Sequence, residues 1–185
     1  STDAFFKTAA DKFGGKSVYM CATWVMLYDA MLQAQKQGIA NIFSGDSVLI
    51  AGGGDKGYDL PDDWKEVIFS GLGFDQAYEV YGMSEMMTSF VQCGHGNYHI
   101  PPIIIPFVLD PISGNPLPRS GTQTGRFAFL DLMPDTFWGG FISGDEVALS
   151  GFDHDCDCGR KGAYIGAKIR RYSASEGGDD KINCS

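Results

Sequence analysis

The sequence predicts an α/β fold in which a βαβ portion with parallel strands precedes an antiparallel sheet or partial barrel. Two observations predict this order. In the first half, two short strand-like runs flank a helix-like segment, and a glycine-rich turn follows the first run. From about residue 98, short alternating runs are separated by Gly and Pro turns, which is typical of antiparallel strands. We therefore predict a βαβ portion over 1–92, an antiparallel portion over 93–172 and a flexible tail over 173–185.

Composition and charge limit the class of protein. The chain has 185 residues, of which 44% are hydrophobic and 20% are charged, so it can bury a core. Its 23 acidic residues exceed the 14 basic residues, the net charge is −9, and no basic run is present, which argues against a nucleic-acid partner. The sequence contains no apolar run of about 18 residues, so we expect no transmembrane segment.

The cysteines and the first residues bear on location. Five cysteines, an odd number, match a secreted disulfide framework poorly and predict a reducing, cytoplasmic compartment. The first residues, Ser-Thr-Asp-Ala, resemble neither a signal peptide nor an initiator Met. We therefore expect the chain to begin inside a longer protein.

The first element that we predict is a helix over 18–37. A broad apolar stripe runs along it, and a polar run follows before Gly38, which is a typical helix stop. The stripe contains methionines and aromatic residues that core packing explains, so we assign it no function.

The βαβ unit comes next. The run 47–51 predicts a strand, the glycine loop 52–57 follows it, and Pro61 opens a helix that reaches about Gly71. The run 76–81 predicts the second strand, which is parallel to the first, so the loops after both strands open on one edge of the sheet. The glycine loop matches neither the GxxxxGK[ST] nor the GxGxxG pattern, and on its own a plain tight turn explains it equally well.

The second half predicts shorter strands. The runs 98–100 and 103–109 are separated by Pro101 and Pro102, and the second contains Pro106, so these prolines restrict both runs to sheet edges or bulges. A long turn covers 110–118, and the runs 125–132 and 141–149 alternate as strands.

Two groups of polar residues indicate chemistry. Ser84 and Glu85 follow Tyr81 and Gly82 at the end of the second predicted parallel strand, where α/β sheets bind ligands. From these residues alone, a solvated loop that caps a following helix is an equally good explanation.

The second group contains thiols. Cys156 and Cys158 lie two residues apart, and Cys93 and His99 flank an upstream Gly-rich loop, which together provide the four N/S ligands of a structural zinc site. His95 and His154 are rival ligands, and ordinary reduced cysteines are the alternative explanation. A closed site would hold the loop after YGMSE against the sheet.

Several motifs together resemble a known superfamily. YGMSE at 81–85 resembles the YG-x-[ST]-E signature of adenylate-forming acyl ligases, and GGFISGDEV at 139–147 resembles their Y-R-T-G-D segment. GGGDKG at 52–57 lies where that family holds adenine. The resemblance runs from about residue 48 to the end, and more narrowly the following segments resemble the LuxE-type acyl-protein synthetases, relatives of phenylacetate-CoA ligases: CGHGNYHIPP, DP-x-x-G-x-PLP, TGRFAFLDL, WGGFISGDE, CDCGR and GGDDKINC.

The resemblance implies a reaction and a cofactor set. Such enzymes join a carboxylic acid to the α-phosphate of ATP, release pyrophosphate and require Mg²⁺. Glu85 would bind the Mg²⁺, Ser84 would bind the α-phosphate, and Asp145 would accept the ribose hydroxyls. Nucleotide contacts would also come from Tyr81, Gly82, Gly53, Gly54 and Arg171. The family also has a related Cys and His pair, which favours the zinc site.

The C-terminal segment has implied roles as well. Asp179-Asp180 matches the family's hinge acids, whereas Arg160 belongs to the Cys-x-Cys turn. LuxE-type enzymes pass the acyl group from acyl-AMP to a cysteine near their C-terminus, which here is Cys184. The resemblance thus implies an acid-thiol ligase that activates a fatty or aryl carboxylic acid and delivers the acyl group to a fatty acyl reductase.

The departures from the family pattern matter equally. The Ser/Thr/Gly-rich phosphate loop and the small C-terminal domain with its catalytic Lys have no counterpart in this sequence. We therefore expect the C-terminal half of a longer enzyme, which is inactive alone. The alternatives are a CoA ligase of the phenylacetate type and a zinc-stabilised binding module without catalysis.

Overall fold

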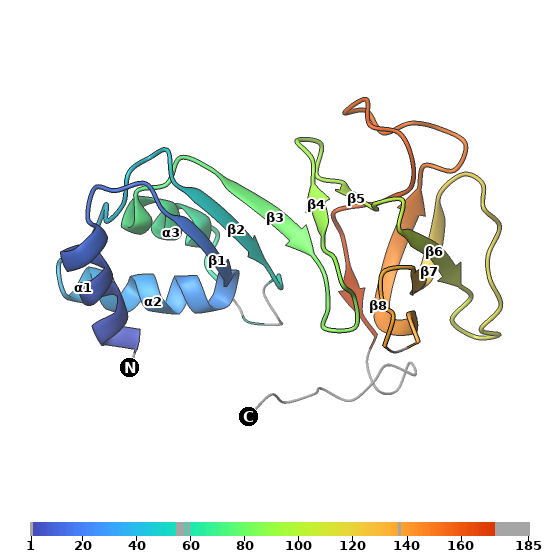
Figure 1. Cartoon of the computed structure of the whole chain (residues 1–185), viewed down its shortest axis with the longest axis horizontal. Helices are drawn as coiled ribbons and strands as arrows, with labels where there is room; N and C mark the ends of the chain where they lie inside the picture. The colour runs from blue at the N-terminus through green and yellow to red at the C-terminus, as the bar shows by residue number, and fades with distance from the viewer. Residues whose placement is uncertain (1, 55–57, 59, 137, 173–185) are drawn as a thin grey trace. The chain divides into compact units, whose positions relative to one another are not determined.

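The computed structural model describes residues 2–54, 58, 60–136 and 138–172, and the chain divides into two compact units (Figure 1). The first unit is Ser1–Val80 and the second is Tyr81–Ser185, so the division falls twelve residues before the one expected at 92/93. The predicted tail over 173–185 lies outside the described residues. None of the described helices is long and apolar enough to cross a membrane.

The first unit is a parallel α/β arrangement. Strand β2 pairs in parallel with β1 on one side and with β3 on the other, with Leu49 opposite Met20 and Ala77. Buried side chains from all three helices gather with Leu49 and Ala51 of β2 in one core. The elements are α1 (Thr2–Phe13), β1 (Tyr19–Thr23), α2 (Trp24–Lys36), β2 (Val48–Gly52), α3 (Trp64–Leu72) and β3 (Ala77–Tyr81).

The predicted βαβ unit is confirmed, with two differences. The order β2, α3, β3 and the parallel pairing agree with the sequence, but α3 begins at Trp64, after a turn that includes Pro61. The helix predicted over 18–37 is wrong at its start, because Tyr19–Thr23 is strand β1 and the helix begins at Trp24. Pairing with β2 fixes 19–23 as a strand, since its backbone groups complete the ladder there.

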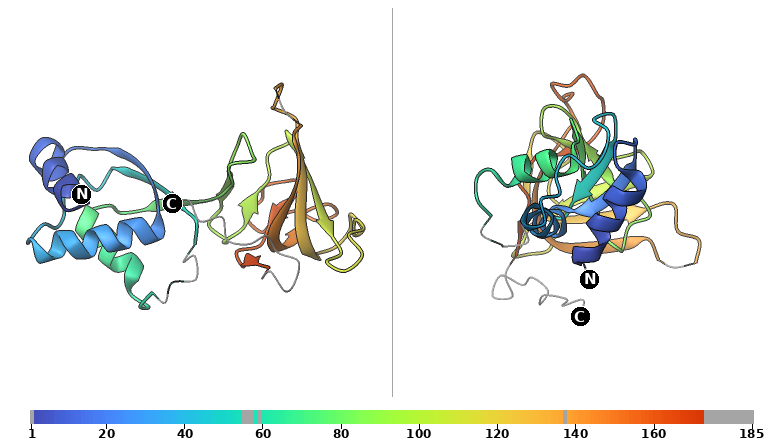
Figure 2. Two further views of the ribbon diagram at one scale, coloured as in Figure 1. Left: turned by 90° about the horizontal axis from the view of Figure 1, so that it is seen from below. Right: turned by 90° about the vertical axis from the view of Figure 1, so that its left-hand side faces the viewer.

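The second unit is antiparallel, as predicted (Figure 2). Its strands follow one another in the order β4-β5-β9-β8-β7-β6, and β10 pairs with β8. Strand β6 is last in this order, which explains how it accommodates Pro106, a residue without a backbone N–H. The strands are β4 (Phe90–Gln92), β5 (Tyr98–His99), β6 (Ile104–Leu109), β7 (Gln123–Asp131), β8 (Gly140–Ser150), β9 (Tyr164–Ile165) and β10 (Arg170–Arg171).

Aromatic residues form the core of the second unit. Phe90, Phe127 and Phe129 are at most 1% exposed, and the rings of Phe127 and Phe129 stack with centroids 5.7 Å apart. Phe127 and Phe129 are alternate residues of β7 and point into this core, so Asp131, two positions after Phe129, is also buried. The core therefore holds the strand ends on which the candidate site is built.

Candidate functional site

The loop from residue 82 to residue 89 carries the predicted phosphate and metal residues. It joins β3 to β4, and Ser84 is exposed while Glu85 is half-buried. Because the next described element is a strand, the alternative in which these side chains cap a following helix is wrong. The loop returns close to its start at Gly82, where an added Cβ would lie 2.7 Å from Ser89 Oγ and 3.3 Å from Ser89 Cβ, so a larger residue there would displace the Ser89 side chain.

Tyr81, Asp145 and Arg171 meet in the second unit. The Tyr81 hydroxyl donates a hydrogen bond to Asp145 Oδ2 at 2.6 Å, and Arg171 Nη1 donates to Asp145 Oδ1 at 3.1 Å. Asp145 lies opposite Arg171 in the pairing of β8 with β10 and is 8% exposed. Gly144 leaves room for the arginine, since a Cβ there would lie 3.0 Å from its guanidinium.

The electrostatics of this cluster keep the Tyr81 phenol protonated. Burial, followed by the negative charge of Asp145 and the hydrogen bond to it, raises the pKa of Tyr81 far above its usual range. Ser143, which is 1% exposed, supports the cluster: its hydroxyl accepts the Asp145 N–H at 3.1 Å and donates to the Phe127 carbonyl at 2.9 Å. Asp145 is therefore a carboxylate with a fixed orientation.

The other predicted nucleotide residues lie elsewhere or outside the description. Gly53 and Gly54 follow β2 in the first unit, with φ of 86° and 53°, so both backbone positions favour glycine. Residues 55–57 of the same loop lie outside the described residues, as do Asp179, Asp180 and the predicted acceptor Cys184.

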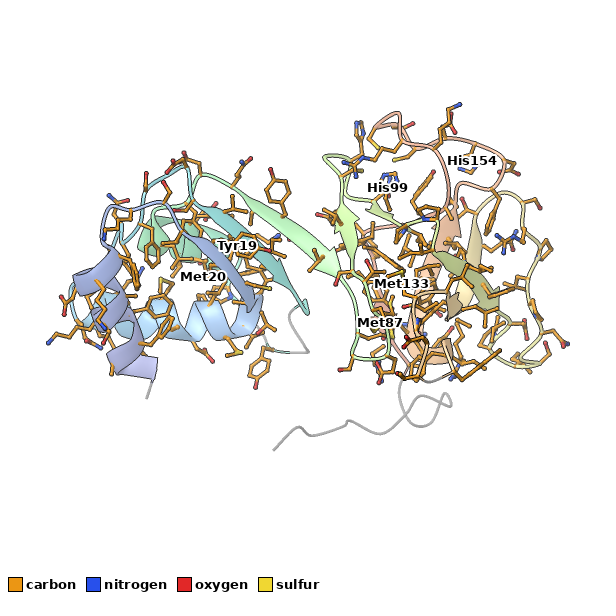
Figure 3. All side chains as sticks on the ribbon, viewed as in Figure 1. Tyr19, Met20, Met87, His99, Met133 and His154 are labelled. Atoms are coloured by element: carbon orange, nitrogen blue, oxygen red, sulfur yellow. The ribbon has the colours of Figure 1, made fainter. Side chains whose placement is uncertain are left out.

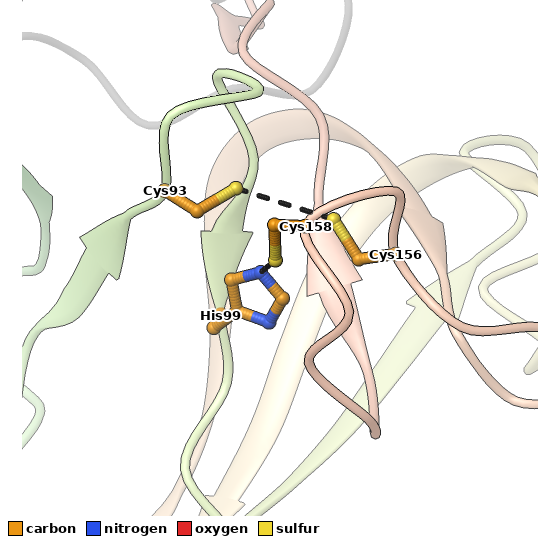
Figure 4. Close-up of side chains that lie close together, drawn as sticks. All are labelled: Cys93, His99, Cys156 and Cys158. Carbon is orange, nitrogen blue, oxygen red and sulfur yellow. Dashed lines mark hydrogen bonds between the residues drawn. The ribbon is translucent and has the colours of Figure 1, made fainter.

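The four predicted metal ligands lie together in the second unit (Figure 4). The ligand atoms of Cys93, His99, Cys156 and Cys158 all lie within 4.8 Å of one another. Cys93 Sγ is 4.0 Å from Cys156 Sγ, and Cys158 Sγ is 3.2 Å from His99 Nε2. Ligands about 2.3 Å from a tetrahedral zinc ion lie roughly 3.8 Å apart, so this spacing fits zinc.

Two turns of the same design present the thiols. In the first turn the Gly96 N–H donates to the Cys93 carbonyl at 2.9 Å, and in the second the Gly159 N–H donates to the Cys156 carbonyl at 2.8 Å. Both glycines have a positive φ, 79° and 83°, which other residues rarely adopt. The spacing Cys-x-x-Gly in both turns is the local signal for this geometry.

The environment of the thiols favours a thiolate at Cys93. Burial opposes ionisation of this thiol, but the backbone N–H groups of His95 and Asn97 and the thiols of Cys158 and Cys156 outweigh it and lower the pKa of Cys93. Asn97 Nδ2 also donates to Cys156 Sγ at 3.3 Å. Several sulfur atoms that share so small a volume are stabilised together by a divalent cation.

His99 is the histidine of this cluster. Burial, and then the positive charge of Arg160, lowers the pKa of His99, which leaves the imidazole neutral as metal binding requires. Of the rival ligands, His95 is exposed, and His154 is exposed and pairs with Asp153 at 2.8 Å. Neither belongs to the group of ligand atoms formed by the described residues.

Sequence reasoning missed Asp131. This carboxylate is 5% exposed, accepts the Met87 N–H at 2.8 Å through Oδ2 and accepts the Met133 N–H at 2.9 Å through Oδ1. The signal was available in the stretch Phe-Ala-Phe-Leu-Asp, where the alternation places Asp131 on the same inward face as Phe127 and Phe129.

Comparison with known proteins identifies the fold. No protein-family model and no curated protein matches the chain. An open conformation of 2-hydroxyisobutyryl-CoA ligase in complex with 2-HIB-AMP and CoA is 17% identical, aligns with 91% of this chain and gives a TM-score of 0.59. Apo MatB from Rhodopseudomonas palustris and an ATP-bound RpMatB-BxBclM chimera are 17% and 18% identical, each aligns with 90% of this chain, and both give a TM-score of 0.51.

The chain spans only part of these structures. It covers 38% of the length of the 2-hydroxyisobutyryl-CoA ligase and 32% of MatB and of the chimera. At this level of identity the likeness establishes the fold, and it confirms the predicted class, in which a parallel portion is followed by an antiparallel portion. The chain therefore has the fold of a part of the 2-hydroxyisobutyryl-CoA ligase and MatB structures.

Proposed function

We propose that this chain is the nucleotide-binding part of an enzyme that uses ATP to activate a carboxylic acid as acyl-AMP. One observation carries the proposal: Tyr81, the last residue of β3, bonds to Asp145 of β8, and the loop that follows Tyr81 presents Ser84 and Glu85. Tyr81 thus connects the proposed ribose acceptor, Asp145, to the start of the loop that would face the phosphates. The likeness in fold to a ligase in complex with 2-HIB-AMP supports the assignment.

The chemistry assigns a task to each side chain. A carboxylate oxygen of the acid attacks the α-phosphorus of ATP, a new P–O bond forms, and the bond to pyrophosphate breaks. The Ser84 hydroxyl donates a hydrogen bond to an oxygen of the α-phosphate, and Asp145 accepts hydrogen bonds from the ribose. Glu85 holds Mg²⁺, which neutralises phosphate charge. Arg171 adds a positive charge beside the nucleotide, which the net acidity of the chain makes necessary.

We further infer that Cys93, His99, Cys156 and Cys158 hold a structural zinc ion. Four protein ligands leave no open coordination position, so the site stabilises the fold and binds no substrate. The three cysteines come from the two strand connections that border β5 and β9, and His99, the last residue of β5, lies opposite Tyr164 in that pairing. Zinc would thus hold the segment after β4 against the β8–β9 connection.

The acyl acceptor separates two versions of the enzyme. The LuxE-type motifs favour a synthetase that activates a fatty acid, transfers the acyl group to the Cys184 thiol and supplies a reductase. The alternative is an acyl- or aryl-CoA ligase, which the likeness to a CoA ligase favours. A zinc-stabilised module without catalysis is the third version, and the presence of Ser84, Glu85 and Asp145 together argues against it.

Intact-mass analysis tests these versions. The full-length protein is incubated with Mg²⁺, ATP and a panel of fatty and aryl acids, and wild type is compared with Cys184→Ser and Asp145→Asn. An acyl adduct that hydroxylamine removes and that Cys184→Ser lacks supports the synthetase. AMP release that requires CoA, without an adduct, assigns the CoA ligase. If no acid yields acyl-AMP or pyrophosphate, or if Asp145→Asn retains full activity, the proposed role of this site is refuted.

A further inference from the structure

A buried carboxylate connects the loop that carries Ser84 and Glu85 to the end of β7. Asp131 is the last residue of that strand and is 5% exposed. Its Oδ2 accepts the Met87 N–H at 2.8 Å, and its Oδ1 accepts the Met133 N–H at 2.9 Å. The bond to Met133 closes a local turn, whereas the bond to Met87 joins segments 44 residues apart in the sequence.

Backbone bonding, and not side-chain packing, holds the loop at Met87. The Met87 side chain is 60% exposed and that of Met133 is 55% exposed, so neither residue is fixed by burial of its own side chain (Figure 3). On the neighbouring residue, the Met86 side chain is buried in the aromatic core. Met86 and the carboxylate of Asp131 together determine the path of the backbone immediately after Glu85.

The carboxylate is suited to this task because each oxygen serves a different segment. Among the described residues no basic side chain pairs with Asp131, so its negative charge is balanced by the two backbone N–H donors. Hydrogen bonds to a buried charged acceptor are stronger than neutral ones, and a donor left without its acceptor is costly. An amide side chain offers only one acceptor oxygen, so it can serve one of the two segments.

We propose that Asp131 is a positioning residue, which fixes the backbone of the Ser84–Glu85 loop so that both side chains are held ready for a magnesium nucleotide. This inference rests on the proposed function for its ligand. It does not rest on that function for the positioning itself, since the loop contact is independent of any ligand. Asp131 touches no reacting atom in this assignment and acts through Met87.

Amide hydrogen exchange on the whole chain tests the positioning. In Asp131→Asn, the Met87 or Met133 amide should exchange about tenfold faster or more, because one of the two bonds is lost. Asp131→Glu keeps both acceptor oxygens and should restore part of the protection. Asp110→Asn is the matched control: it removes one negative charge, but the backbone bonds of Asp110, to Ile112 and Ser113, use Oδ1 alone, which asparagine retains.

Equilibrium binding of Mg·ATP to the same variants of the full-length protein tests the consequence. We expect at least tenfold weaker binding in Asp131→Asn, partial recovery in Asp131→Glu and no change in Asp110→Asn, with core amides of β7 and β8 equally protected throughout. Unchanged exchange at both the Met87 and the Met133 amide in Asp131→Asn overturns the inference, and so does unchanged Mg·ATP binding in a variant whose Met87 amide exchanges faster. If wild type does not bind Mg·ATP, the proposed function fails, and the exchange data alone decide whether Asp131 fixes the loop. If Asp131→Asn does not fold, Asp131→Glu and the protection of the wild-type Met87 amide decide the same question.

Discussion

The hydrogen bond between Tyr81 and Asp145 allows a direct energetic test. In Tyr81→Phe the ring stays, and with it the contacts to Phe90 and Phe127 at centroid distances of 5.8 Å and 6.0 Å. Only the hydroxyl is lost, and with it the 2.6 Å bond to a carboxylate that is 8% exposed. A bond of this kind contributes about 1.5–3 kcal/mol. We therefore expect the unfolding free energy of the variant to fall by about 2 kcal/mol.

Urea unfolding of wild type and Tyr81→Phe at neutral pH measures this change. Tyr78→Phe is the control, because Tyr78 belongs to the same strand and is 44% exposed, and the substitution removes the same atom. We expect the control to lie within about 0.5 kcal/mol of wild type, as surface substitutions usually do. If Tyr81→Phe is equally neutral, the hydroxyl does not orient Asp145, and the reasoning that joins β3 to the ribose acceptor is refuted.

Three further predictions address the metal, the loop and the pH dependence. The protein should contain one zinc ion per chain. Cys156→Ser should lose the metal and more than about 3 kcal/mol of stability, whereas His95→Ala and His154→Ala should keep both. Elemental analysis with thermal unfolding checks this, and full zinc retention in Cys156→Ser would contradict the proposed ligand set. Gly82→Ala should weaken Mg·ATP binding, because its Cβ would lie 2.7 Å from Ser89 Oγ and 3.3 Å from Ser89 Cβ and would make the Ser89 side chain shift, while Gly94→Ala, with nothing within 4 Å, should bind normally in the same titration. Wild-type binding by Gly82→Ala would contradict this. The backbone N–H of Ser113, then its hydroxyl, and the N–H of Ile112 lower the pKa of Asp110 below 3.8, so this carboxylate stabilises the fold above its unfolded pKa and ceases to do so as pH falls through its folded pKa. An NMR titration that places the Asp110 pKa at or above 3.8 would contradict the turn geometry.

Elements were predicted correctly where the local sequence pattern favours the same secondary structure as the strand pairing in the fold. The order β2, α3, β3 was readable because the glycine loop and Pro61 mark the boundaries between elements. The error at 19–23 has a physical cause: these residues alternate between core and surface, but their apolar members also fit the stripe of the helix that follows. Pairing with β2 decides between the two, and pairing partners are not visible within a window of one segment.

The same distinction applies to the candidate site. The metal cluster was predicted from the Cys-x-Cys pair, from the Gly-rich loop between Cys93 and His99 and from the family resemblance, and the ligand atoms of these four residues do lie within 4.8 Å of one another. The burial of Asp131 was readable from the alternation of its strand, but its partner was not, because Met87 lies 44 residues away and contributes only a backbone N–H, which leaves no trace in residue type. Ser143 escaped notice for the same reason, since one of its partners is the carbonyl of Phe127.

These contacts together explain how the loop after Tyr81 can have a defined backbone conformation although part of it is exposed. The segment from Tyr81 to Cys93 is fixed by the bond of Tyr81 to Asp145, by that of Met87 to Asp131, by Phe90 in the core and by Cys93 in the thiol cluster. Between the first two of these points lie Ser84, which is exposed, and Glu85, which is half-buried. A backbone held on both sides keeps its side chains in place at little entropic cost when a ligand binds, which is how preorganised sites gain affinity and rate. Release of either neighbouring point, by Tyr81→Phe or Asp131→Asn, should therefore weaken the binding of a nucleotide as well as the fold.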